Sequence, residues 1–311
     1  MLSKVAIFNP DKGVFSIQTE KVNENLEPTQ VLLKNLSIAV NEIDVIDGKV
    51  RKLTKLGSSA CAEVVKVGEN VTWLHRGDRV AYFTETAAYA EYKCVDHSKL
   101  IKVPANIASN TAAAILYRGC VAHMVAVRAF IIRDGINALI DNIHTATSSV
   151  IGWMAKKRGA FVVGITSENT EISPEACDIV IRSAGDTMVK EVLKATKNIG
   201  CHVYYPGLLP IPVSNLGDTI TVSGVIVDYL NTMSSIPTAI IAQKSLFYTI
   251  PSLVDYKSIR SELVLTVDAI LMMLSQSSFN IEFSEYGFEK INEAFAATAS
   301  NQSSQATIIK V

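Results

Sequence analysis

The side chains that most often bind metal ions are few and widely spaced in this chain. Its 311 residues include five cysteines and five histidines, with no C-x-x-C pair and no histidine at metal-ligand spacing from a cysteine or a carboxylate. Metal centres depend on such spacings, so we expect no bound zinc or other metal. The odd number of cysteines argues against a disulfide framework and favours reduced thiols in a cytoplasmic protein.

A run of hydroxyl side chains offers a different chemistry, the binding of an anion. The run follows a short apolar segment, Ala138–Ile140, and opens a segment with helical character, Ser149–Arg158. Its members are Thr145, Thr147, Ser148 and Ser149. A helix N-terminus presents free N–H groups and the positive end of the helix dipole, so hydroxyls placed there can help to hold a phosphate. Alternatively, the hydroxyls only cap the helix, at Ser148 or Ser149.

The composition argues against several classes of protein. Hydrophobic residues make up 49% of the chain and charged residues 19%, a balance typical of a globular protein rather than a disordered one. The net charge of −1 and the lack of a Lys/Arg run argue against nucleic acid as a partner. No stretch reaches about 18 uninterrupted apolar residues, so we expect no membrane span. The length is sufficient for two domains.

The first third of the sequence predicts a β-rich domain. Short alternating or apolar stretches are separated by turn residues such as Gly68-Glu69-Asn70, and a polar, turn-like stretch lies near Asp47-Gly48. The expected strands are 31–40, 62–67, 88–95 and 100–103, and Gly77-Asp78-Arg79-Val80 opens another strand after a turn. Short strands at this spacing are typical of a small barrel-like domain.

From Asn110 onward the pattern changes to alternating helices and strands. Helices are expected over 112–129, 149–158, 188–197 and 261–275. The expected strands are 138–140, 161–165, 179–181, 203–205 and 220–227. This alternation predicts a parallel, doubly wound sheet. A terminal strand at 306–311 could return to the first domain.

Several short motifs occur, once each, in a fixed order along the chain. They are Asn41-Glu-Ile-Asp44; Gly57 to Gly68 with Gly77-Asp78-Arg79-Val80; Ala88-Tyr89-Ala90-Glu91-Tyr92; Lys102-Val103-Pro104 with Ala112-Ala113-Ala114; and Ser245-Leu246-Phe247 with Pro251-Ser252-Leu253. In this order and spacing they resemble the quinone oxidoreductase (zeta-crystallin-like) branch of the zinc-free medium-chain dehydrogenase/reductase superfamily. Each motif is weak alone, but together they cover essentially the whole chain.

The resemblance implies an α/β protein with two domains. A GroES-like substrate domain would comprise residues 1–117 and 252–311, and a Rossmann domain would comprise residues 118–251. In this family a hydride passes from the nicotinamide of NADPH to a quinone or an activated enone without a metal ion.

Two polar residues match the active-site cleft of the family. Asn41 would hydrogen-bond the oxygen of the quinone or enone, and Asp44 would orient a water or a basic partner. The alternative is that both residues cap the following helical turn. The family also implies a homodimer in which a strand of each Rossmann domain pairs across a two-fold axis. The stretch Ile220–Val227 suits that edge, although it equally suits an internal strand.

The cofactor loop departs from the family pattern. The family's Ala-Ala-x-Gly-Gly-Val-Gly falls on Asn142–Ser148, which reads Asn-Ile-His-Thr-Ala-Thr-Ser and has no glycine. Glycines there allow a tight turn and a close approach to the pyrophosphate, so their loss predicts weakened NADPH binding. The expected cofactor contacts are Arg118, Thr145, Thr147, Ser148, Ser149, Ser167 and Gly224. The lack of an acidic residue at Thr166-Ser167 favours NADP over NAD, whereas Glu171 would repel a 2′-phosphate.

Three functions stay open at the level of the sequence. The first is an NAD(P)H-dependent reductase of a small quinone or enone with modest affinity for its cofactor. The second is a pseudoenzyme, a reductase fold retained for binding or scaffolding that binds NADPH weakly or not at all. The third is a module that binds a different anionic ligand in the same cleft.

Overall fold

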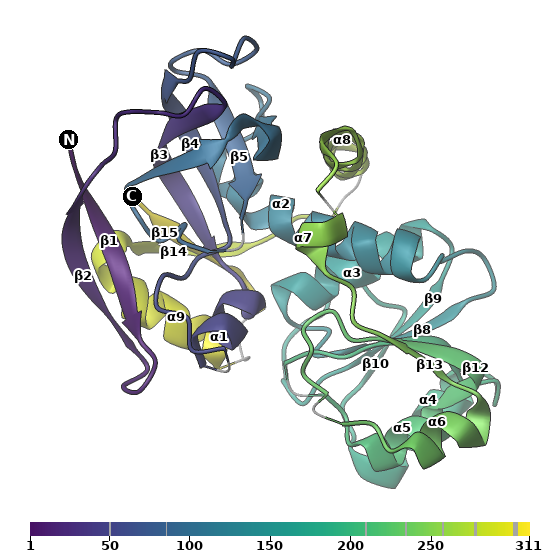
Figure 1. The fold of residues 1–311 in the computed structure, drawn as a ribbon. Helices are drawn as coiled ribbons and strands as arrows, with labels where there is room; N and C mark the ends of the chain where they lie inside the picture. The colour runs from purple at the N-terminus through teal and green to yellow at the C-terminus, as the bar shows by residue number, and fades with distance from the viewer. Residues whose placement is uncertain are drawn as a thin grey trace.

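The structure is a computed structural model that describes residues 1–49, 51–84, 86–208, 210–233, 235–256, 258–276, 279–300 and 304–311. Two lobes, each built on a sheet, lie side by side, and one long helix runs between them (Figure 1). The first lobe is rich in antiparallel strands, and the second is a parallel sheet with helices. The chain is therefore a mixed α/β protein, as the sequence predicted.

The first lobe combines strands from both ends of the chain. A hairpin of β1 (Leu2–Asn9) and β2 (Val14–Lys21) lies beside a seven-stranded sheet. The strands of that sheet are β3 (Gln30–Val40), β4 (Ser59–Val67), β5 (Arg79–Phe83), β6 (Tyr92–Asp96), β7 (Leu100–Lys102), β14 (Phe283–Gly287) and β15 (Ala306–Lys310). Strand β15 pairs antiparallel with β3, which confirms that the C-terminal strand returns to the first lobe.

Short helices complete the first lobe. They are α1 (Glu42–Lys49), α9 (Ile291–Ala299) and the 3₁₀ turns His97–Lys99 and Phe288–Lys290. Helix α1 begins just after β3 and includes Asp47-Gly48, where the sequence predicted a turn. Tertiary packing explains the difference, because a Cβ on Gly48 would approach the side chains of Leu56 and Phe8 to 2.8 Å.

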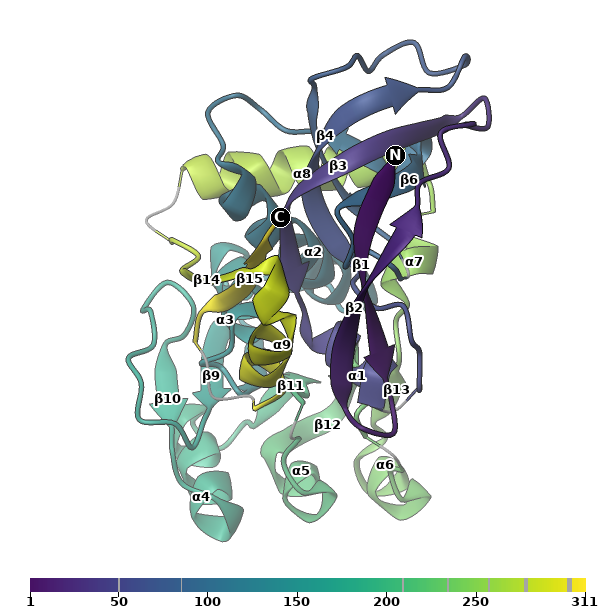
Figure 2. The ribbon, with the colours of Figure 1, turned by 90° about the vertical axis from the view of Figure 1, so that its left-hand side faces the viewer.

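The second lobe is a six-stranded parallel sheet. Its order is β10 (Ile179–Ile181), β9 (Phe161–Ile165), β8 (Asn137–Asp141), β11 (Cys201–Tyr205), β12 (Ile220–Val227) and β13 (Phe247–Thr249). The associated helices are α3 (Ala146–Lys157), α4 (Gly185–Ala195), α5 (Val213–Thr219) and α6 (Thr238–Lys244). Helices α4, α5 and α6 lie in a row at the end of this lobe (Figure 2). Successive strands are added on one side of β8 from β8 to β10 and on its other side from β11 to β13. The order therefore reverses between β8 and β11, and ligands bind at this point in doubly wound sheets.

The edge strand expected for a dimer is not at the edge. Strand β12 pairs with β11 on one side and with β13 on the other, so Ile220–Val227 is an internal strand. The edge is formed by the three-residue strand β13, which follows the loop after α6 and escaped notice because it is so short. The homodimer itself stays a prediction.

Helix α2 (Ser109–His123) connects the lobes and continues into a π-helical turn, Met124–Ala129. Its buried side chains join one core that extends from Ala81 of the first sheet to Val203 of the second. By length and composition, the combined helix Ser109–Ala129 could cross a bilayer, although 78% of its most apolar window is buried inside the protein. That burial is typical of the core helix of a folded domain.

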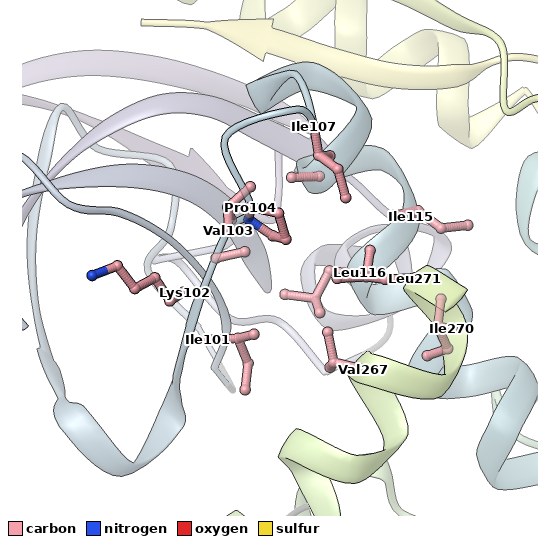
Figure 3. A pocket seen from close by; sticks show the side chains of 12 residues that line it. Ile101, Lys102, Val103, Pro104, Ile107, Ile115, Leu116, Val267, Ile270 and Leu271 are labelled. Carbon is pink, nitrogen blue, oxygen red and sulfur yellow. The ribbon is translucent and has the colours of Figure 1, made fainter. Parts of the chain in front are cut away.

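Helix α8 (Arg260–Ser275) crosses the outside of α2, preceded by the short α7 (Leu253–Tyr256). The helices approach closely at Gly119, where a Cβ would lie 2.8 Å from Ile270. Val267, Ile270 and Leu271 of α8 face Ile115 and Leu116 of α2 across a small apolar gap of about 20 Å³ (Figure 3). This gap is too apolar and too small to serve as a ligand site.

Candidate functional site

A cavity of about 460 Å³ lies between the two lobes. Its wall from the first lobe includes Ser58, Phe83 and Thr84, and Tyr117 of α2 and Tyr229 after β12 complete it. Other lining residues are Ile43, Asp47, Arg51, Leu53, Thr86, Val121, Met124, Asn231, Ile250, Pro251, Ser252, Leu253 and Asp255. The wall thus combines aromatic and apolar side chains with hydroxyls and with the charged Asp47, Arg51 and Asp255, and apolar walls with a few polar groups are typical of sites for small ligands.

Asn41 and Asp44 lie behind this cavity, because both side chains are buried. The Asn41 side-chain amide donates to the hydroxyl of Ser58 at 2.9 Å and to that of Ser59 at 3.0 Å. Asp44 accepts from the backbone N–H of Asn41 at 2.8 Å and from the hydroxyl of Tyr89 at 2.9 Å. The bond from Asp44 to the residue before α1 is a cap of that helix, so the catalytic role of the pair stays a prediction. Ser58, which the sequence reasoning missed, separates Asn41 from the cavity.

The polar cluster around Asp44 is only partly satisfied. Burial raises the pKa of the Asp44 carboxyl to about 7, against the opposing hydrogen bonds from Asn41 and Tyr89. Oδ1 of Asn41, Oδ1 of Asp44 and Nε of Arg118 have no hydrogen-bond partner among the described residues. Unsatisfied buried polar atoms are rare in native proteins and often mark functional sites.

The predicted hydroxyl run lies at the N-terminus of α3, at the carboxyl end of β8. Thr145 caps the helix by accepting from the N–H of Ser148 at 3.4 Å, so the helix begins earlier than expected. The Ser148 hydroxyl donates to the carbonyl of Asp141 at 2.8 Å, and that of Ser149 to the carbonyl of Ala146 at 3.0 Å. The Thr147 hydroxyl donates to a carboxylate oxygen of Glu42 at 2.7 Å. All four hydroxyls therefore have partners within the protein.

The loop that leads to this helix is filled by its own side chains. Asn142 adopts a left-handed backbone with φ of 48°. The side chain of Ile143 is buried, and a Cβ on Gly164 would lie 2.7 Å from it. A Cβ on Gly207 would likewise lie 2.2 Å from the side-chain oxygen of Asn142. The glycines that this corner needs are thus in neighbouring strands and loops instead of in the cofactor loop.

A second acidic group, Asp141, lies under the loop. It ends β8, accepts from the Ile211 N–H at 2.8 Å and is hydrogen-bonded by the Tyr204 hydroxyl. Burial raises the pKa of its carboxyl to about 7, although both hydrogen bonds favour the charged form. The sequence reasoning missed Asp141; the signal for it was a carboxyl group at the end of an apolar strand.

The remaining predicted cofactor contacts are dispersed. Arg118 is buried in α2 and donates to the carbonyls of Ala114 at 3.0 Å and Val40 at 3.1 Å. Ser167 is exposed just after β9. Gly224 lies inside β12 rather than at its carboxyl end, and a Cβ there would lie 2.2 Å from Ile220. Packing explains this glycine, and its role in cofactor binding stays a prediction.

A further cavity of about 380 Å³ lies on the other side of the α3 N-terminus. His144, Ser149 and Glu171 line it together with residues near Asn280. A space of only about 20 Å³, lined by Glu42, Arg118 and Thr145 among others, adjoins this cavity at Ala146. The N-terminus of α3 therefore borders both of these spaces.

Comparison with known proteins agrees with this architecture. Residues 27–129 match the family model of the alcohol dehydrogenase GroES-like domain. A quinone oxidoreductase of Pseudomonas aeruginosa is 25% identical over 305 residues, which cover 91% of either chain. Residues 27–129 are therefore similar to alcohol dehydrogenase GroES-like domains, and nearly the whole chain is similar to a quinone oxidoreductase.

Solved quinone oxidoreductase structures show the same fold as this chain. A quinone oxidoreductase of Pseudomonas syringae superposes with a TM-score of 0.90 at 23% identity, over 99% of this chain and all of the other. The Escherichia coli quinone oxidoreductase, solved in complex with NADPH, superposes with a TM-score of 0.87 at 19% identity over the full length of both chains.

The family that the chain resembles implies NADPH, but this corner does not fit the cofactor's pyrophosphate as it is arranged. The hydroxyl of Thr147 at the α3 N-terminus already donates to the Glu42 carboxylate, and the side chains of Asn142 and Ile143 fill the loop. For metals, no group of three or more His, Cys, Asp or Glu side chains that could hold an ion occurs in the part of the chain that the structure describes.

Proposed function

We propose that this chain is an NAD(P)H-dependent oxidoreductase of the quinone reductase type, acting on a small quinone or activated enone. Its relatives support the reaction class. The observation that carries the proposal is the cavity of about 460 Å³ between the lobes, with Phe83, Tyr117 and Tyr229 in its wall. A flat conjugated ring would pack against such aromatic side chains.

Ser58 is the residue best placed to bind the oxygen of this substrate. It lines the cavity, and its own oxygen accepts from the Asn41 side chain at 2.9 Å. The Ser58 hydroxyl also hydrogen-bonds the buried Asp44 carboxyl, so a carbonyl oxygen in the cavity would compete with that carboxyl for the hydroxyl proton. Asn41 then acts as a positioning residue that orients Ser58, which accounts for its burial behind the wall.

The test is the quinone-dependent oxidation of NADPH, followed by the loss of NADPH absorbance. We expect turnover with 1,4-naphthoquinone or a simple enone at NADPH concentrations up to about 1 mM, the upper end of common KM values. The Ser58→Ala variant should raise KM for the quinone while the protein keeps its fold. Absence of turnover, both in the wild type and in the Glu42→Gln variant, which removes a carboxylate at the α3 N-terminus, would reject the proposal.

A second candidate, a pseudoenzyme that binds a small ligand without NADPH, is favoured by one specific observation. Each predicted hydroxyl of the α3 N-terminus is hydrogen-bonded within the protein, and Thr147 is held by a carboxylate. This candidate predicts that NADPH leaves the unfolding temperature unchanged, because a ligand stabilises only a native state that it binds.

A cytoplasmic location and a homodimer belong to the same proposal. All five cysteines are free, which fits a reducing compartment. The short edge strand β13, which carries the exposed Phe247, is the place where a second parallel sheet could be added. Gel filtration with light scattering would measure the oligomeric state, and Phe247→Asp should shift a dimer towards monomer.

A further inference from the structure

Glu42 connects the two lobes at the point where a dinucleotide would cross between them. It is the first residue of α1, in the first lobe, and its side chain is 6% exposed. Its carboxylate accepts from Thr147, the second residue of α3 in the second lobe, at 2.7 Å in a buried hydrogen bond. A negative charge from one lobe is therefore held at the helix N-terminus of the other.

That N-terminus is the position of a phosphate in dinucleotide-binding folds. It follows the first strand beside the reversal of the sheet, where the free N–H groups of the first helical turn and the helix dipole favour an anion. A carboxylate at this place supplies the same kind of charge as a phosphate oxygen. Two anions would repel each other there in a buried, weakly screened environment.

We propose that the Glu42 side chain occupies the place of the cofactor's pyrophosphate and keeps this corner closed to dinucleotides until it withdraws. The inference rests on the proposed function, since it concerns the cofactor site of that oxidoreductase. Glu42 lines a small space together with Arg118 and with Thr145 at the start of α3, and this space adjoins the cavity of about 380 Å³ at Ala146. Glu42 is thus a specificity-determining residue for the cofactor.

Arg118 is a second group at this corner that favours a bound anion. Its guanidinium is buried, lines the same small space as Glu42, and has an Nε without a hydrogen-bond partner among the described residues. When the Glu42 carboxylate is removed or withdrawn, a buried cation and a helix N-terminus remain around that space. Both stabilise an anion, so removal of the carboxylate should strengthen phosphate binding at this corner even though Asn142 and Ile143 still fill the loop.

The test compares NADPH binding by the wild type with binding by Glu42→Gln and Glu42→Ala, using quenching of protein fluorescence. Both variants should bind NADPH at least about tenfold more tightly than the wild type, since like-charge repulsion at a binding site costs several kcal/mol. Inorganic pyrophosphate should raise the unfolding temperature of Glu42→Ala but not of the wild type. Glu63→Gln, which removes an exposed carboxylate on β4, is the charge-matched control and should bind as the wild type does.

Thr147→Val tests the inference independently, in case the Glu42 variants do not fold. It keeps the volume of the side chain and removes only the donor that holds Glu42, so NADPH affinity should rise in this variant too. Equal affinity in the wild type and in all three variants would overturn the inference. The proposed function fails separately, if a variant binds NADPH tightly but reduces neither quinone nor enone.

Discussion

The two ends of the space between the lobes differ in how many of their polar side chains are already hydrogen-bonded within the protein. At the cavity end, Ser58, Thr84 and the aromatic wall surround a volume of about 460 Å³. At the α3 end, the hydroxyls of Thr145 to Ser149 are bound within the protein and a carboxylate from the other lobe covers the helix N-terminus. The same fold thus keeps a substrate-sized space while closing the place for a phosphate.

Removal of Arg118 should produce the largest effect on this contrast. Arg118→Met removes a buried cation that lies near the Glu42 carboxylate and donates to the carbonyls of Ala114 and Val40, and hydrogen bonds of a charged group contribute about 1.5–3 kcal/mol each. Urea unfolding measures the loss in the free energy of unfolding. The control is Arg128→Met, because Arg128 is exposed and pairs with Glu262 at the surface, where a pair is worth about 0–1 kcal/mol. Similar losses in the two variants would mean that the closed end is not held by charge.

Asp141 should make the closed end sensitive to pH. The pKa of its carboxyl is about 7 in the folded protein and 3.8 as the reference value, so the folded state binds this proton more tightly than the unfolded state. Its contribution to stability is therefore largest at low pH, falls as the pH rises from about 4 to about 7, and is constant above that range. The slope is at most ~1.4 kcal/mol per pH unit.

Asp141→Asn should remove that slope. The difference in the free energy of unfolding between the variant and the wild type should grow in favour of the variant from pH 5 to about pH 7 and then stay constant to pH 8, as measured by urea unfolding at each pH. Asp11→Asn, in the exposed turn between β1 and β2, controls for the change in net charge. Parallel pH profiles of Asp141→Asn and the wild type would contradict a carboxyl whose pKa is raised by burial.

The packed floor of the cofactor loop should resist small insertions. Gly164→Ala places a Cβ 2.7 Å from Ile143, and overpacking of this kind costs about 1–3 kcal/mol. Thermal unfolding should show the loss, and adding Ile143→Val should recover part of it. If Gly164→Ala is as stable as the wild type, the loop is not packed against β9 in the way described.

The smallest effect is expected at the open end. Ser58→Ala removes one hydrogen bond to the substrate oxygen, worth about 0.5–1.5 kcal/mol, so KM for the quinone should rise by several-fold to about tenfold. Cys94→Ala on β6, a half-buried side chain outside the cavity lining, should leave KM unchanged. A KM that does not change in Ser58→Ala would remove Ser58 from the substrate site.

The two ends also differ in how far the sequence could reveal them. The change from short alternating strands to strand–helix alternation predicted both lobes, and the missing glycines of Asn142–Ser148 marked the unusual loop. The bond from Glu42 to Thr147 could not be foreseen, because it joins residues 105 positions apart and depends on how the lobes pack. The same holds for Asp141, whose burial follows from the packing of Tyr204 and Ile211 around it.

Some local predictions were wrong for physical reasons that lie outside the local sequence. Asp47-Gly48 has the composition of a turn but lies in α1, because packing against Phe8 and Leu56 overrides the weak helix propensity of glycine. Of the two roles left open for Ile220–Val227, the internal strand is confirmed, because the three residues Phe247–Thr249 suffice to form one more strand beside it. Periodicity indicates that a strand exists, but the order of strands depends on long-range pairing.

Helix α2 has a consequence for how the protein unfolds. Its side chains belong to one continuous core that includes Ala81 from the first sheet and Val203 from the second. Each lobe also has a hydrophobic cluster of its own, but both sheets pack against this helix, so the two lobes should melt together in a single cooperative transition. An excised half would expose its side of α2 to water and should aggregate instead of folding, which makes the whole chain the unit of stability.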